Sequence, residues 1–224
     1  MKKLILTVLV SLGLTTASFA GSFGIGASGS LALVGASGTE TTTAGTVGGG
    51  TADKHDKSVD ELGGIGAVFV DYQFDNGIAI GISHVPGSAE VSGSKHERSE
   101  TAQGVSGTDA SGDVTRKADA EVENFNTIYV EYPIGGTGFI KAGFSQIDVN
   151  TLENTVTDSG TYGNDTVDGY TIGLGGRSEF AGLFTSYAVE YTDFSSLDLT
   201  STTGNSISAD IDVLEVKISV GKRF

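Results

Sequence analysis

Hydrophobic residues alternate with small or polar residues along most of the chain, with a period of two. Between residues 127 and 132, Ile128, Val130 and Tyr132 alternate with Thr127, Tyr129 and Glu131. Alternation of this kind predicts half-buried β-strands rather than helices. The same pattern predicts eight strands in all, at residues 23–33, 67–74, 78–83, 127–132, 140–145, 169–175, 183–191 and 214–221.

The connections between these strands alternate in length. Three are short, at residues 74–77, 134–137 and 179–182, and four are long and rich in Gly, Ser, Thr and Asp, at residues 36–62, 91–119, 151–166 and 196–207. The pair Asn76-Gly77 is the usual signal for a type I′ turn. An even number of strands with this alternation is typical of outer-membrane barrels, whose short turns face the periplasm. We therefore predict an all-β fold, an eight-stranded antiparallel up-and-down transmembrane β-barrel.

The first residues have the layout of a secretory signal peptide. Lys2 and Lys3 precede an apolar run at residues 4–14, and Ser18-Phe19-Ala20 is a small-x-small cleavage site. The run is too short for a membrane-spanning helix, which needs roughly 20 residues. We expect a signal peptide at 1–20 that is removed, and a barrel at 21–224 in the outer membrane of a Gram-negative cell.

Composition narrows the possible functions. The chain has a formal net charge of −15, which argues against a nucleic-acid partner because such partners need a basic face. It has no cysteine, so disulfides and thiolate chemistry are excluded. Its 34 glycines, set against only 2 prolines, alternate with apolar residues and indicate strands with one crowded face.

Charged residues in the middle of the predicted strands fall on the face opposite the apolar one. They are Asp71, Glu131, Lys141, Glu190, Glu215, Lys217 and Arg223. On a lipid-facing surface the basic ones would cost about 2–4 kcal/mol each, so the charged face is expected to line the lumen. The interior of an eight-stranded barrel is just wide enough for side chains to fill it. The sequence therefore predicts a packed polar core, either a structural ion-pair network or a gated ion path, with one more carboxylate than cation.

Aromatic residues gather near the predicted strand ends. Tyr72, Phe74, Tyr132 and Phe180 lie near the short turns, and Phe144, Tyr170 and Tyr191 lie nearer the long connections. This grouping is typical of the aromatic girdles at the two membrane interfaces.

The export signal, the eight strands and the terminal Phe224 together resemble the small eight-stranded outer-membrane barrels, the group of OmpA, OmpX and the opacity proteins. The resemblance covers the architecture of the whole mature chain. In that group the last strand resembles an assembly signal that the barrel-insertion machinery reads, an aromatic end preceded by apolar residues at every second position. Phe224, Val220, Ile218 and Val216 fit this pattern. Lys222 departs from it, although its amine can extend to the interface.

The chain offers weak signals for catalysis or metal binding. Some small barrels of this kind are enzymes with a His and a Ser or acidic partner near the outer rim, but the spacing of His55, His84, His96 and Ser83 shows no nucleophile with an orienting partner. Acidic residues in the long connections carry carboxylate oxygens, which are the kind of ligand that calcium prefers. They are Glu40, Asp53, Asp56, Asp60, Glu61, Asp158 and Asp165, without a recognisable calcium loop. We expect no catalytic residue, cofactor or metal.

The function expected from these features is a structural or surface-interaction role, displayed on four long extracellular connections. A narrow porin-like channel for ions or small solutes is the alternative. The expected partners are outer-membrane lipid and, during assembly, the barrel-insertion machinery. The sequence does not identify an extracellular ligand.

Overall fold

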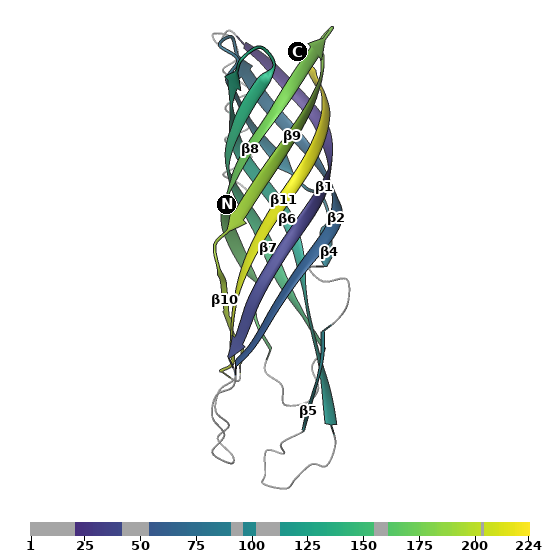
Figure 1. The fold of residues 1–224 in the computed structure, drawn as a ribbon, viewed down its shortest axis with the longest axis vertical. Helices are drawn as coiled ribbons and strands as arrows, with labels where there is room; N and C mark the ends of the chain where they lie inside the picture. Colours follow the sequence, from purple (N-terminus) through teal and green to yellow (C-terminus); the bar gives the residue numbers. More distant parts are fainter. Residues whose placement is uncertain (1–20, 42–53, 91–95, 102–112, 155–160, 203) are drawn as a thin grey trace.

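The computed structural model describes residues 21–41, 54–90, 96–101, 113–154, 161–202 and 204–224 (Figure 1). Eight strands form one antiparallel ring, closed where the first strand pairs with the last. They are β1 (Gly21–Thr41), β2 (Lys54–Phe74), β3 (Ala79–His84), β6 (Asp113–Ile134), β7 (Gly138–Asn154), β8 (Asp165–Phe180), β9 (Leu183–Phe194) and β11 (Ser206–Arg223). The predicted fold class is confirmed. The expected signal peptide, residues 1–20, lies outside the described residues.

Among the described residues, no helix is long and apolar enough to cross a membrane.

The ring closes at the two ends of the described chain. The N–H of Phe224 donates to the carbonyl of Phe23 at 2.9 Å, and the N–H of Phe23 donates to the carbonyl of Phe224 at 3.2 Å. From there the β1–β11 ladder continues without a register shift to Thr41↔Ser206. Closure matters because lipid offers no hydrogen bonds to an unpaired strand edge.

The strands run further than the polar composition of the connections suggests. The β1–β2 ladder continues to Thr41↔Lys54, well inside the connection expected at 36–62. Three further strands, β4 (Ser88–Glu90), β5 (His96–Thr101) and β10 (Leu197–Thr200), extend the sheet on β6 and β11. The strand ends expected at the 36–62 connection were wrong because polar residues mark where a strand leaves the membrane, whereas backbone pairing continues beyond it.

One short turn differs in type from the sequence-based expectation. At Asn76-Gly77 only the glycine has a positive φ, of 84°, and its N–H donates to the carbonyl of Phe74 at 2.9 Å. This is a type I turn followed by a left-handed glycine, not the predicted type I′ turn. Positive φ at both central residues, the type I′ requirement, occurs instead at Ala181 (51°) and Gly182 (77°).

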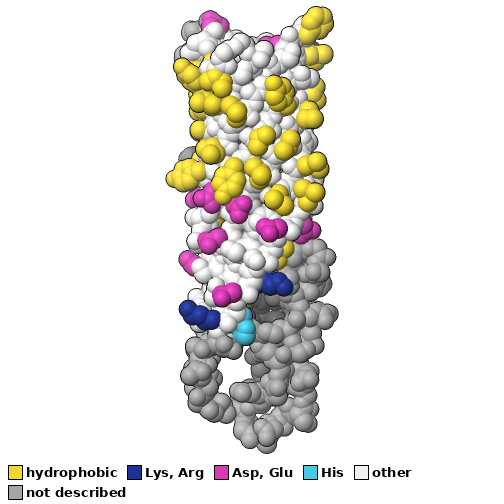
Figure 2. Space-filling model, in the orientation of Figure 1, with side chains coloured by type: hydrophobic (Ala, Val, Ile, Leu, Met, Phe, Trp, Pro, Cys, Tyr) yellow, Lys and Arg dark blue, Asp and Glu magenta, His cyan; other side chains and the backbone are white. Residues whose placement is uncertain are grey.

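The outer surface divides along the barrel axis. Side chains on the half nearer the C-terminus are largely apolar, and a band of acidic side chains follows below them (Figure 2). Exposed outward residues in the apolar half include Phe23, Ile25, Ile128, Val130, Ile172, Leu174, Val216 and Ile218. The half with the three short turns, called the turn end below, therefore carries the lipid-facing belt, and the opposite end is called the loop end.

Glycines on the inner face make room for aromatic rings from neighbouring strands. A Cβ at Gly221 would overlap the ring of Phe184, and a Cβ at Gly81 would meet the ring of Tyr129. Phe139 fills the space beside Gly175 in the same way. The expected purely polar core is therefore wrong in composition. Four large rings, those of Phe69, Tyr129, Phe139 and Phe184, are buried inside the barrel.

This packing predicts opposite effects for two glycines of β1. A Cβ at Gly26 would overlap the ring of Phe69 and lie 2.9 Å from the Cα of Gly221, whereas a Cβ at Gly29 meets nothing within 4 Å. We expect Gly26→Ala to destabilise the barrel by about 1–3 kcal/mol through overpacking. Gly29→Ala should be neutral or slightly stabilising. Urea unfolding in lipid vesicles measures both, and equal losses would contradict this packing.

Candidate functional site

The lumen at the turn end holds a first group of ion pairs. Nη1 of Arg223 lies 2.9 Å from Oδ1 of Asp71, and its Nε donates to Glu179 at 2.8 Å. Nη2 of Arg177 lies 2.6 Å from Glu131 and 3.9 Å from Asp71. The Asp71 carboxylate therefore lies between two guanidinium groups, and neither its side chain nor that of Glu131 reaches solvent appreciably.

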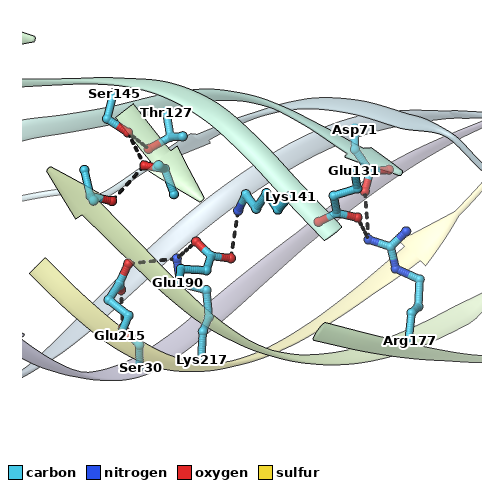
Figure 3. A network of polar contacts seen from close by, with 12 residues as sticks. Ser30, Asp71, Thr127, Glu131, Lys141, Ser145, Arg177, Glu190, Glu215 and Lys217 are labelled. Carbon is cyan, nitrogen blue, oxygen red and sulfur yellow. Dashed lines mark hydrogen bonds and ion pairs between the residues drawn. The ribbon is translucent and has the colours of Figure 1, made fainter. Parts of the chain in front are cut away.

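A second group lies one layer further into the barrel (Figure 3). Glu190 accepts from Lys141 at 2.8 Å and from Lys217 at 2.9 Å, one amine at each carboxylate oxygen. Lys217 also lies 3.1 Å from Glu215, whose other oxygen accepts from the hydroxyl of Ser30 at 2.6 Å. The chain Lys141–Glu190–Lys217–Glu215 thus links strands β7, β9 and β11 across the lumen, and Ser30 joins it to β1.

A row of hydroxyls follows the second group toward the loop end. Thr127 and Ser145 are 2.8 Å apart, Ser145 and Thr171 are 2.7 Å apart, and Thr171 and Thr192 are 2.7 Å apart. All four side chains are buried. Each hydroxyl can donate and accept, so three hydrogen bonds link the four side chains into one row.

Aromatic rings also contact three of the paired cations. Nζ of Lys141 lies 4.1 Å from the centroid of the Tyr129 ring. The guanidinium carbons of Arg223 and Arg177 lie 4.7 and 5.1 Å from the centroid of the Phe184 ring. Cation–π contacts of this kind gain strength where water is excluded. The ion pairs, the hydroxyl row and these rings are together called the ion-pair core below.

The structure places all seven lumen residues named from the sequence inside the barrel, and each makes at least one of these contacts. Arg177 and Glu179 were missed. Both lie on the inner face of β8, continuing Thr171, Gly173 and Gly175 at every second position. Arg177 changes the charge balance of the buried groups, because its guanidinium gives four cations against the four buried carboxylates. Glu179, a fifth carboxylate of the network, is exposed at 44%.

The inner face changes character toward the loop end, where the alternation inverts. On β7 the outward residues become polar, at Gln146 and Asp148, while Ile147 and Val149 point inward and are almost fully buried. On β11 the inward Ile211 behaves in the same way. The buried apolar cluster comprises Ala32, Ile147, Val149, Val167, Phe194, Leu197, Leu199, Ile211 and Val213.

Beside this cluster lies a cavity of about 320 Å³. Its walls are mainly apolar and include Val34, Ile65, Phe125, Phe194 and Val213. We call the cavity together with the apolar cluster the apolar chamber. The lumen is thus divided, with a charged and filled half at the turn end and an apolar half at the loop end.

The described residues considered for catalysis and metal binding are spread over several strands. Nδ1 of His84 lies 2.9 Å from the amide oxygen of Asn126, and Ser83 lines the lumen on the other face of β3. His55 lies on β2, and the side chain of His96 is outside the described part of the structure. Within the described ranges, no group of three His, Asp or Glu residues could hold a metal ion. Asp53 and Asp158 lie outside those ranges.

The four residues of the expected assembly signal share one face. Val216, Ile218, Val220 and Phe224 all point outward and are exposed. Nζ of Lys222, the residue that departs from the pattern, lies 4.9 Å from the centroid of the Phe224 ring. The lysine therefore covers part of the terminal aromatic ring at the rim of the barrel.

The ring of pairings and the apolar belt decide the architecture. This chain is an eight-stranded β-barrel of the outer-membrane type. No protein-family model matches the sequence. No curated protein matches it either.

Among solved structures, the chain is similar to three bacterial proteins. Ail, the attachment invasion locus protein of Yersinia pestis, has 12% identity and a TM-score of 0.46 over 92% of this chain and 100% of that one. The outer membrane protein OprG of Pseudomonas aeruginosa has 12% identity and a TM-score of 0.49 over 91% and 96%. The outer membrane protease OmpT of Escherichia coli has 9% identity and a TM-score of 0.46 over 94% and 100%. No activity is inferred from likenesses of this size.

Because Glu190 pairs with two lysines, we expect a conservative substitution at this residue to lower the stability of the barrel strongly. Glu190→Gln keeps the shape but leaves Lys141 and Lys217 without their shared carboxylate, and removing one partner of a buried pair costs about 3–5 kcal/mol. The matched control is Asp198→Asn on β10, an exposed acid-to-amide change expected to stay within about 0.5 kcal/mol. Urea unfolding of both variants in vesicles gives the difference, and similar stabilities would contradict a buried, charged Glu190.

Proposed function

We propose that this barrel is a closed outer-membrane protein with a structural or surface-interaction role, and that its loop end is the working part. The observation that carries the proposal is the ion-pair core, which fills the lumen of the membrane-embedded half. A cavity of about 20 Å³ lies among residues such as Tyr129, Lys141 and Glu190. That is room for about one water molecule, not for a hydrated ion.

The contacts in the core also oppose gating. An ion path past Glu190 would require both of its lysine partners to move, and separating a buried pair costs about 3–5 kcal/mol. The four buried carboxylates and four cations balance, and the fifth carboxylate, Glu179, pairs with Arg223. A narrow channel, the alternative function, would need the core to rearrange.

The loop end offers a surface beyond the membrane. The β1–β2 ladder continues past the belt to Thr41↔Lys54, and exposed acidic residues such as Asp56, Asp60 and Asp210 lie on the outer face there. Surface-exposed segments held by a rigid scaffold commonly carry binding functions. The proposed partners are outer-membrane lipid and the barrel-insertion machinery, which would contact the outward face of β11. We propose no enzymatic role.

Conductance separates the proposed function from its alternative. The mature barrel should be silent in planar bilayers, because the core leaves no continuous path. The variant Lys141→Ala with Glu190→Ala removes one cation and one carboxylate and should open measurable conductance. Removing the exterior Asp198 should change nothing. Steady conductance of the unmodified barrel that varies with substitutions at Glu131 or Lys141 would favour the channel instead.

The orientation of the barrel can be tested because the chain has no cysteine of its own. Ser208→Cys, on the exposed loop end of β11, should react with a membrane-impermeant maleimide on intact cells. Asn76→Cys, in the exposed turn between β2 and β3, should react only after the outer membrane is permeabilised. The reverse pattern would place the loop end in the periplasm and remove the basis for a surface role.

A further inference from the structure

The wall of the barrel is interrupted beside the apolar chamber. β2 pairs with β3 only from Gln73↔Ala79 to Val68↔His84. Beyond that point β4 pairs with β6, and no other described strand pairs with this edge of β2. Toward the loop end, β2 and the β5–β6 hairpin point to opposite sides of the molecule in Figure 1. We call the interval between Gly63–Gly66 of β2 and Val85–Ala89 the side gap.

The sequence explains why the ladder stops there. Val85 still donates its N–H to the carbonyl of Phe125 at 2.9 Å, so the chain remains attached to β6. Pro86, the next residue, has no N–H to give to β2. Gly87 then takes a left-handed φ of 92° and redirects the chain. A bulge in β6 at Asn124, which has a φ of 56°, shifts the register on the other side.

The apolar chamber reaches this gap from inside. Residues of both edges, Gly63–Gly66 and Val85–Ala89, line the cavity of about 320 Å³. This volume falls within the range of roughly 300–1,000 Å³ that is usual for small-molecule sites. Gly63 and Gly66 contribute no side chain to close the gap, and a Cβ at either would meet nothing within 4 Å.

Outside, the gap opens onto the lipid-facing surface. Gly64 pairs with Leu31, and Leu62 pairs with Leu33. All three leucines are exposed on the outer face, at 64%, 69% and 43% for Leu31, Leu62 and Leu33. The β2 residues that line the cavity therefore lie beside apolar side chains of the outer surface. On the opposite side the ion-pair core and the hydroxyl row close the cavity toward the turn end.

We propose that an acyl chain of a surrounding membrane lipid enters through the side gap and lies in the apolar chamber. The acyl chain would exchange hydrocarbon for mainly apolar walls without passing through water. The occupant is a lipid already in the bilayer rather than a solute from the medium, because the gap lies level with the leucines of the belt. This site goes beyond the proposed surface role and does not depend on whether the barrel conducts.

The proposal can be tested by photocrosslinking in a bilayer. The full mature barrel is reconstituted in vesicles of phosphatidylcholine, part of which carries a diazirine near the end of one acyl chain, and labelled peptides are identified by mass spectrometry. We expect labels on the inward residues Ile65, Phe125 and Phe194 in addition to the outward leucines. Gly63→Phe fills the chamber and should abolish the inward labels. Gly29→Phe, an equally open but outward position, should leave them unchanged.

Labels confined to outward residues would overturn the proposal, as would inward labels that persist in Gly63→Phe. Inward labels obtained only with a free diazirine fatty acid added from the aqueous phase would overturn the membrane as the source.

A second measurement does not depend on how Gly63→Phe folds. The chain has no tryptophan, so Phe125→Trp and Phe69→Trp each place a single reporter inside the barrel. Phosphatidylcholine brominated on its acyl chains should quench the first strongly and the second weakly, and equal quenching would contradict acyl-chain entry.

Discussion

The constraint on which this structure depends is that no backbone N–H or C=O can remain unpaired in lipid. The reciprocal hydrogen bonds of Phe23 and Phe224 satisfy it by closing β1 against β11. Closure with eight strands then fixes the width of the interior, and a lumen of that width must be filled with side chains. The inward charges, the rings and the glycines opposite the rings all follow from this one requirement.

Filling the lumen with charges is tolerable only if every charge has a partner. Glu190 between Lys141 and Lys217, and Asp71 between Arg177 and Arg223, meet that condition inside the membrane-embedded half. Beyond the belt, toward the loop end, the outer surface of the barrel faces water instead of lipid. The apolar residues accordingly turn inward, as at Ile147 and Val149, and the barrel acquires a second, hydrophobic interior. The boundary between these two interiors is where the cavity and the side gap are found.

The architecture could be predicted from the sequence because alternation with a period of two and alternating connection lengths are local signals. The inward charges followed from the same alternation. Arg177 could have been found in this way, since it continues the inner face of β8. However, the pair Gly175-Gly176 before it resembles the end of a strand. The type I′ turn predicted at Asn76-Gly77 was wrong because Asn-Gly suits both turn geometries, and only the φ of Asn76 separates them.

Other features depend on contacts between distant strands. The inversion at residues 145–150 resembles the end of a strand when it is read from composition alone. The side gap needs Pro86, the bulge at Asn124 and the glycines of β2 to lie on one side of the barrel, and no local pattern brings these segments together. The assignment of rings to particular glycines, such as Phe184 to Gly221, likewise depends on the register of β9 against β11 and of β11 against β1.

The central claim is that the membrane-embedded lumen is closed by paired charges. Water-edited solid-state NMR of the barrel in lipid bilayers tests it most directly, because it measures magnetisation transfer from water to each side chain. The account predicts a cross-peak between Nζ of Lys141 and the carboxylate carbon of Glu190, with slow transfer from water to Glu190 and Ser145 compared with the exposed Asp198. Transfer as fast as that to Asp198 at every inward position from Arg223 to Ser145 would indicate a continuous water column and contradict the account.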